Sequence, residues 1–164
     1  MNDTRWAIVF IIAGIGLFLA MPQWRVLGEA PETYPIALDA FEAKVDAMIA
    51  AHATGREEEG IPVVRPAGGD IFLVARRWSF TPILELEAGQ TYRIHATSAD
   101  ILHGLAFGGN EVLLMPGQAS VLEVRPVRSG RMPMQCSEFC GAEHNGMRQL
   151  VDVAPAMHLA KRRE

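Results

Sequence analysis

The sequence predicts a small all-β domain, a β-sandwich or Greek-key barrel, that follows one N-terminal transmembrane helix and a short amphipathic helix. Three observations predict this organisation: an uncharged apolar run near the N-terminus, a segment with apolar residues at helical spacing, and a series of short strand-like runs from residue 70 onward. The length of 164 residues and the hydrophobic fraction of 49% fit one domain with an added segment. The net charge of −4 is too small to indicate binding to nucleic acid.

The N-terminal apolar run has the length and the flanking residues of a membrane anchor. Residues 6–24 read WAIVFIIAGIGLFLAMPQW and contain no charged residue. As an α-helix they would extend about 28 Å, close to the thickness of the hydrocarbon core, with Trp6 and Trp24 at the two interfaces. The alternative is a cleaved signal peptide with Arg5 as its basic residue, but no A-x-A-like cleavage site follows. We therefore predict a transmembrane anchor over residues 1–24, with the N-terminus in the cytoplasm.

Residues 25–69 are predicted to contain an amphipathic helix and a linker. Apolar residues recur at three- and four-residue steps between Ile36 and His52, which is the spacing of one helix face. They are Leu38, Phe41, Val45, Met48 and Ile49. The helix is expected to pack on its own domain or on a partner subunit. Glycine, proline and the acidic run 57–59 then predict a solvated loop or linker up to residue 69.

Residues 70–154 are predicted to form the β domain, followed by a C-terminal tail over 155–164. Six short runs are β-branched or alternating and are separated by glycine- and proline-containing turns. The runs are IFLVARRW (71–78), ILELEAG (83–89), TYRIHAT (91–97), EVLLM (111–115), ASVLEVRP (119–126) and MRQLVDV (147–153). In the second run Leu84 alternates with Glu85, which predicts one solvent-exposed face. Because no helix separates the runs, they predict a sandwich or barrel.

The C-terminal stretch QCSEFCGAEHNGM, residues 135–147, contains both cysteines of the chain together with a histidine and a methionine. The four residues Cys136, Cys140, His144 and Met147 follow one another at steps of four, four and three. This spacing also matches one face of a helix, but the glycines and the asparagine between them favour a loop between two late strands.

Three simpler kinds of site compete for these residues. A disulfide would use both cysteines but would explain neither His144 nor Met147. A zinc site with two cysteines and two histidines would leave the thioether unused. A mononuclear blue-copper site of one cysteine, two histidines and an axial methionine would leave one cysteine unused. Copper is favoured, because soft sulfur donors hold Cu(I) well and imidazole suits both oxidation states.

Such a site also needs a histidine from a separate strand, and ADILHGLAF (residues 99–107) supplies His103. The other histidines, at positions 52, 95 and 158, are expected to be structural or on the surface, and His95 falls on a predicted exposed face. Met132 and Met134 compete with Met147 as sulfur donors, but they precede the cysteine loop and are predicted to lie in a strand. Four apolar residues are expected to form a dry shell around the site: Leu102, Leu105, Phe107 and Phe139.

The pattern C-x-E-x-C-G-x-x-H-x-x-M after a D-x-x-H-G segment resembles subunit II of haem–copper cytochrome c oxidases, which carries the binuclear CuA centre. The resemblance extends over residues 70–153, and the single membrane helix is similar to that of the ba-type branch. Nitrous-oxide reductase and a CuA-bearing nitric oxide reductase share the ligand spacing. The resemblance implies a cupredoxin-like fold and two copper ions bridged by the thiolates of Cys136 and Cys140, with His103 and His144 each terminating one copper.

The resemblance also implies roles for three further residues. Met147 would be a weak ligand to one copper, and the backbone carbonyl of Glu138 would be a weak ligand to the other. The Glu138 side chain would help to bind magnesium at the interface with subunit I, a position where the ba-type branch usually has glutamine. Trp78 occupies the position where the family has an aromatic residue near the point at which electrons enter.

The function implied is that of an electron-receiving subunit in an inner or plasma membrane, with its domain on the outer side. Reduced cytochrome c, or a small blue-copper protein, would donate the electron. A haem in subunit I would receive it for oxygen reduction. The chain itself would contribute no general acid, base or nucleophile. Two alternatives remain: the CuA subunit of a nitric oxide reductase, and a membrane-anchored copper carrier or assembly factor.

Overall fold

The computed structural model describes residues 3–20 and 31–156, which belong to two separate units, Met1–Ala30 and Pro31–Glu164. The first unit contains one helix, α1 (Asp3–Ala20), whose large apolar side chains are exposed. Over the described residues, none of the helices combines the length and the apolar character needed to cross a membrane. Residues 1–2 and 21–24 of the predicted anchor lie outside the described part of the chain.

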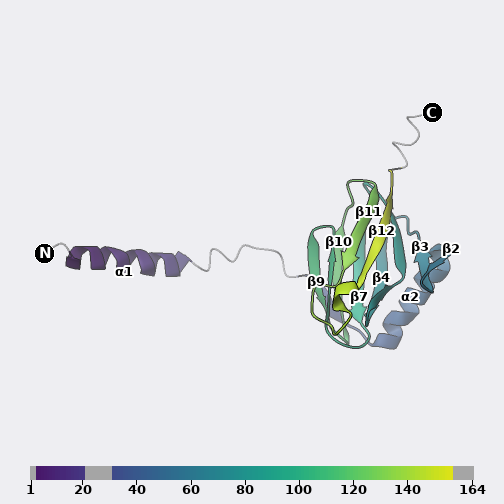
Figure 1. Cartoon of the computed structure of the whole chain (residues 1–164), viewed down its shortest axis with the longest axis horizontal. Helices are drawn as coiled ribbons and strands as arrows, with labels where there is room; N and C mark the ends of the chain where they lie inside the picture. The colour runs from purple at the N-terminus through teal and green to yellow at the C-terminus, as the bar shows by residue number, and fades with distance from the viewer. Residues whose placement is uncertain (1–2, 21–30, 157–164) are drawn as a thin grey trace. The chain divides into compact units, whose positions relative to one another are not determined.

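The second unit is built from two β-sheets and one long helix (Figure 1). Its strands are β1 (Thr33–Pro35), β2 (Ala53–Glu58), β3 (Ile61–Val64), β4 (Gly69–Arg76), β5 (Ser79–Thr81), β6 (Ile83–Glu87), β7 (Tyr92–Ser98), β8 (His103–Phe107), β9 (Asn110–Leu114), β10 (Gln118–Val124), β11 (Gly130–Gln135) and β12 (Arg148–Ala154). One sheet has the order β1-β10-β7-β4-β5, and the other has the order β2-β3-β6-β12-β11-β8-β9. The predicted β-sandwich is confirmed for this unit, and both parallel and antiparallel pairs occur in it.

The main core lies between the two sheets. Alternating side chains such as Ile71 and Leu73 of β4, and Tyr92 and Ile94 of β7, are completely buried. Each such side chain contributes about 1.5–3 kcal/mol by leaving water. The same buried cluster includes both cysteines and one methionine of the predicted metal loop. The sulfur-bearing loop is therefore part of the core and not an external appendage.

The predicted amphipathic helix is confirmed as α2 (Leu38–His52). It buries Phe41, Val45 and Met48, and it packs mainly on β4. Phe41 meets the ring of Phe72 edge-on at 5.8 Å between centroids. The backbone N–H of Phe72 donates to the Met48 sulfur at 3.2 Å. The helix thus packs on its own domain.

The prediction of a loop after this helix is wrong for most of its length, because β2 and β3 form a hairpin there. The turn uses Glu59 and Gly60 with positive φ, and β3 runs parallel to β6. The hairpin brings Arg56 against Glu85, and Arg65 pairs with the same carboxylate at 2.5 Å. Glu85 is therefore only 7% exposed, so the prediction of a solvent-exposed face on this strand is also wrong. The sequence rule fails because the covering arginines come from a segment with the composition of a linker.

His95 was predicted on an exposed face, and this prediction is wrong as well. Its ring stacks on Phe72 at 5.0 Å, shares a hydrogen bond of 2.9 Å with the Tyr34 hydroxyl, and lies 3.3 Å from an Asp70 oxygen. The short strand β1 pairs with β10 at the edge of the same sheet and so places Tyr34 against the histidine. Its expected structural role fits these contacts.

Candidate metal centre

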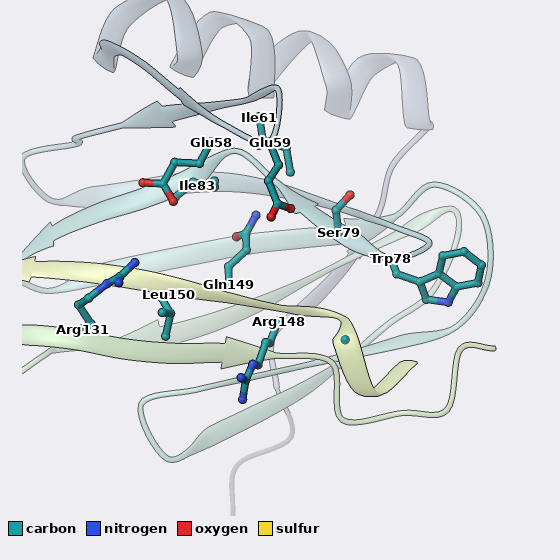
Figure 2. Close-up of a pocket in the computed structure, with 11 residues that line it drawn as sticks. Glu58, Glu59, Ile61, Trp78, Ser79, Ile83, Arg131, Arg148, Gln149 and Leu150 are labelled. Carbon is teal, nitrogen blue, oxygen red and sulfur yellow. The ribbon is translucent and has the colours of Figure 1, made fainter. Parts of the chain in front are cut away.

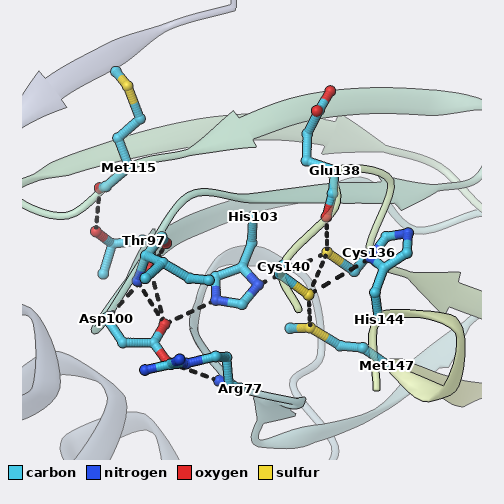
Figure 3. A network of polar contacts seen from close by, with 12 residues as sticks. Arg77, Thr97, Asp100, His103, Met115, Cys136, Glu138, Cys140, His144 and Met147 are labelled. Atoms are coloured by element: carbon cyan, nitrogen blue, oxygen red, sulfur yellow. Dashed lines mark hydrogen bonds and ion pairs between the residues drawn. The ribbon is translucent and has the colours of Figure 1, made fainter. Parts of the chain in front are cut away.

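The candidate site is formed by the start of β8 and by the loop between β11 and β12, residues 136–147 (Figure 3). The predicted loop between two late strands is confirmed, and it contains one short 3-10 turn, His144–Gly146. Its two ends are tied together, because the Cys136 N–H donates to the Met147 carbonyl at 2.9 Å. A segment of twelve residues thereby folds back on itself and turns its sulfur atoms toward the core.

Two free thiols lie at the centre of the site. The Sγ atoms of Cys136 and Cys140 are 3.7 Å apart, much further than the roughly 2.05 Å of a disulfide bond. Both residues are buried, at 6% and 1% exposure. Burial raises the pKa of Cys140 to about 11, and the neighbouring Cys136 thiol adds to the increase. A metal that binds the thiolate form would therefore have to displace the proton.

His103 reaches the sulfur pair from β8 and is completely buried. Its Nδ1 lies 3.7 Å from Cys136 Sγ. On the other side of the ring, Nε2–H donates to Asp100 Oδ1 at 2.8 Å. This hydrogen bond fixes the orientation of the imidazole and leaves Nδ1 directed at the sulfurs, which is how a metal-binding histidine is held.

Asp100 is itself held by a turn that is distant in sequence. It accepts hydrogen bonds from the Arg77 backbone N–H at 3.0 Å, from Arg77 Nε at 3.2 Å and from the Ile101 N–H at 2.8 Å. Burial alone would raise the pKa of Asp100, but the hydrogen bonds from Arg77, His103 and Ile101 outweigh it and hold the pKa well below its usual range. A functional role for this residue was missed, although its signal was present as the first letter of the D-x-x-H-G segment.

His144 and Met147 approach the other sulfur. The Nδ1 of His144 and the Sδ of Met147 each lie 3.6 Å from Cys140 Sγ. Met147 is buried, whereas His144 is half-buried and has the ring of Phe139 at 5.8 Å between centroids. The structure thus brings together the two cysteines, the two histidines and the methionine that the sequence singled out.

The backbone and the side chain of Glu138 point in different directions. Its carbonyl oxygen lies 3.2 Å from Cys136 Sγ, within the sulfur cluster. Its carboxylate is directed away from the sulfurs (Figure 3). Among the residues that the structure describes, a cluster of metal-binding atoms within 4.8 Å of one another is formed by His103 and both cysteines.

Trp78 lies beside the cysteine loop, at one end of a cavity of about 290 Å³ (Figure 2). An idealised Cβ atom on Gly141 would be 3.5 Å from the indole nitrogen, so Trp78 packs against the residue that follows Cys140. The cavity is also lined by Gln149, Glu58 and other residues of β2, β3, β5 and β12. The indole N–H is buried and has no hydrogen-bond partner among the described residues.

The expected dry shell is present only in part. Leu105 and Phe107 are buried in the main core. Leu102 is 41% exposed and Phe139 is 80% exposed, so the prediction is wrong for these two side chains. Both stand next to a candidate ligand at the edge of the site, where the chain turns toward the surface. Met134 is buried in the core and Met132 is half-buried in β11, as their predicted strand position implied.

The fold is that of a cupredoxin domain. The structure is similar to the periplasmic domain of subunit II of cytochrome oxidase from Bradyrhizobium japonicum, with a TM-score of 0.51, 18% identity, and coverage of 59% of this chain and 91% of that domain. It is also similar to rusticyanin from Thiobacillus ferrooxidans, with a TM-score of 0.52, 14% identity, and coverage of 77% and 99%. At these identities the likeness defines the fold.

The amino-acid sequence is similar to those of cytochrome c oxidase subunit 2 proteins. The chain is 32% identical over 72 residues to an alternative cytochrome c oxidase subunit 2 of Bradyrhizobium diazoefficiens, and 33% identical over 75 residues to cytochrome c oxidase subunit 2 of Lycodon semicarinatus. These matches cover 43% and 44% of this chain but only 26% and 33% of the relatives. No protein-family model matches the chain. The resemblance to cytochrome c oxidase subunit II that the sequence motif predicted is confirmed.

Proposed function

We propose that this chain is the CuA-bearing subunit II of a haem–copper cytochrome c oxidase and that its domain receives the electrons that enter the complex. The observation that carries the proposal is the pair of buried, unbonded sulfur atoms 3.7 Å apart, each with a histidine Nδ1 at 3.6 or 3.7 Å. Two thiols are more than a mononuclear blue-copper site needs, and the nearby thioether is not a zinc ligand.

The donor set fits two copper ions. Cys136 and Cys140 would bridge them, and His103 and His144 would each complete one. The Met147 sulfur lies on the side of Cys140, and the Glu138 carbonyl lies on the side of Cys136, which suits one weak ligand for each metal. When bound, the copper pair would supply one-electron transfer.

The residues of the chain bind, orient and exclude water. The cysteines and Met147 are buried in the main core, so the low-polarity surroundings are set by the fold before any metal binds. Asp100 orients His103 through Nε2, which leaves Nδ1 for the metal. No proton-transferring or nucleophilic step is required of this chain.

Electrons would come from cytochrome c or a small blue-copper protein and would pass to a haem in subunit I, where oxygen is reduced. Trp78 would be the point at which they enter, since its indole packs beside Gly141 next to Cys140. The carboxylate of Glu138 points away from the sulfurs and would be free to bind magnesium at the interface with subunit I. In this arrangement one face of the loop would hold the copper ions, and the Glu138 carboxylate on another face would contact subunit I.

The proposed organisation has four parts: an anchor over 1–24, an amphipathic helix and connecting segment over 25–69, the cupredoxin domain over 70–154 and a tail over 155–164. The uncharged run from Trp6 and the exposed apolar side chains of α1 support insertion in an inner or plasma membrane. The domain would then lie on the outer side of the membrane, where its electron donor is found.

The test is to load the full-length chain with copper and to measure copper per chain, the visible spectrum and the electron paramagnetic resonance. Two coppers per chain, a purple colour and a multiline copper signal are expected. A colourless Cu(I) adduct, or one copper per chain, would overturn the proposal. The burial of both cysteines does not favour the carrier alternative, whose site should be exposed to release its metal. Identification of the copurifying large subunit distinguishes an oxygen reductase from a nitric oxide reductase.

A further inference from the structure

We infer that Gly104 is a positioning residue of the metal site, and that its missing side chain lets the cysteine loop dock on the strand that carries His103. The inference rests on the proposed function, because it concerns how the same metal site is held. Gly104 immediately follows His103 in β8 and is buried. Its φ is not positive, so the glycine is not explained by backbone conformation.

The close approach of the loop explains this glycine. An idealised Cβ atom on Gly104 would lie 2.0 Å from Ser137 Oγ, 3.2 Å from Ser137 Cβ and 3.1 Å from the Glu138 backbone nitrogen. The hydroxyl can rotate away, but the Ser137 Cβ and the Glu138 backbone can move only if the loop moves. Any side chain at position 104 therefore forces the Ser137 and Glu138 backbone to shift by a few tenths of an ångström.

The contact between Gly104 and Ser137 lies just beyond the point where the pairing of β8 with β11 ends. β11 and β8 are paired through Gln135 and Ala106 alone. Continued for two more residues, the same antiparallel register would place Ser137 opposite Gly104. The hydrogen-bonded ladder thus ends just before Cys136, and close packing on Gly104 takes its place.

Ser137 lies between two residues that carry candidate ligand atoms, so its packing on Gly104 affects the position of those atoms. Cys136 precedes Ser137, and its Sγ lies 3.7 Å from His103 Nδ1. Glu138 follows Ser137, and its carbonyl oxygen lies 3.2 Å from the same sulfur. A displaced Ser137 would therefore change the distances among three candidate ligand atoms at once. The Ser137 hydroxyl is buried without a hydrogen-bond partner in the described structure, so what matters at position 137 is size, not hydrogen bonding.

The experiment compares Gly104→Ala with Gly146→Ala in the full-length chain. Gly146 lies in the same loop, its φ is not positive, and a Cβ atom there would meet nothing within 4 Å. Gly104→Ala is expected to lower copper affinity at least about tenfold and to change the visible and paramagnetic resonance spectra. Gly146→Ala is expected to change neither. Ser137→Ala is expected to be neutral on its own and to restore part of the affinity when combined with Gly104→Ala.

The unfolding temperature of the metal-free proteins separates positioning from general destabilisation. A Gly104→Ala protein that is less stable but binds copper with unchanged affinity and spectrum would overturn the inference. If Gly104→Ala does not fold, Ser137→Val enlarges the same contact from the loop side, and it is expected to give the same loss of affinity; an unchanged copper site in that variant would overturn the inference. If the wild-type chain itself does not bind two coppers, the proposed function fails instead, so the two failures are distinguishable.

Discussion

The two histidines of the candidate site are held in different ways. His103 begins a strand, is completely buried, and has its second nitrogen bonded to Asp100. His144 begins a short 3-10 turn, is half-buried, and has the exposed ring of Phe139 beside it. One imidazole is therefore fixed by the scaffold, whereas the other depends on the conformation of its loop.

This difference indicates which side of the site loses more conformational entropy when metal binds. On the His103 side, Asp100 and the turn at Arg77 already restrict the ring. On the other side, the backbone hydrogen bonds that shape the His144 turn are local, such as His144 N–H to the Gly141 carbonyl at 3.1 Å. Segments with few long-range hydrogen bonds open more readily. We expect the His144 side to lose more conformational entropy on binding copper.

The largest effect on the copper spectrum is expected from removing a cysteine sulfur, because each cysteine would contribute to both the His103 side and the His144 side of the site. Cys136→Ser and Cys140→Ser should each abolish the two-copper spectrum, because each sulfur would bridge both metals. Copper analysis and electron paramagnetic resonance of the purified full-length variants check this result. If either variant keeps the wild-type spectrum, the two sides are not joined through that sulfur.

Ser137→Ala is the matched control for the cysteine variants. It lies in the same loop and has no hydrogen-bond partner among the described residues. Its spectrum should equal that of the wild type. A loss of signal in this variant would mean that any change in the loop disrupts the site, and that the cysteine variants carry no specific information.

An intermediate effect is expected when the fixed imidazole is released. Asp100→Asn keeps the shape of the side chain but removes the charge that accepts the His103 N–H. Loss of such a partner typically lowers metal affinity about 10–100-fold. Phe139→Ala, next to the other imidazole, should lower copper affinity much less, because the ring is 80% exposed. Competition with a Cu(I) chelator measures both, and equal losses would contradict the difference between the two histidines.

The sequence predicted the part of this molecule that depends on local pattern. Alternation and turn residues located the main strands, and the spacing of apolar residues located α2. The hairpin of β2 and β3 was missed because β2 and the turn are mostly charged and contain two glycines. Its strands are fixed by long-range pairing, since β2 pairs with β3 and β3 pairs with β6. Glu85 is buried for the same reason, since its arginine partners come from that hairpin and from the residue just after it.

The candidate site divides in the same way. Donor chemistry and spacing identified both cysteines, His144 and Met147 from one stretch, and the need for a ligand from another strand identified His103. The roles of Asp100 and Gly104 were not predictable from spacing alone. Asp100 becomes important because a turn far away in sequence donates to it, and Gly104 because the loop crosses directly over it. Both depend on contacts that exist only in the folded chain.

The smallest effect is expected from the weakest proposed ligand on the loop side. Met147→Leu should keep both coppers and shift the reduction potential, because a buried leucine occupies a similar volume while the thioether is lost. Met134→Leu is the matched control, since Met134 is equally buried but lies in β11, outside the cysteine loop. Its potential should stay at the wild-type value. Spectroelectrochemical titration of both variants checks this pair. Loss of all copper in Met147→Leu would mean that the thioether is required for copper binding. A shift of the potential in Met134→Leu alone would mean that Met134, and not Met147, is the sulfur ligand.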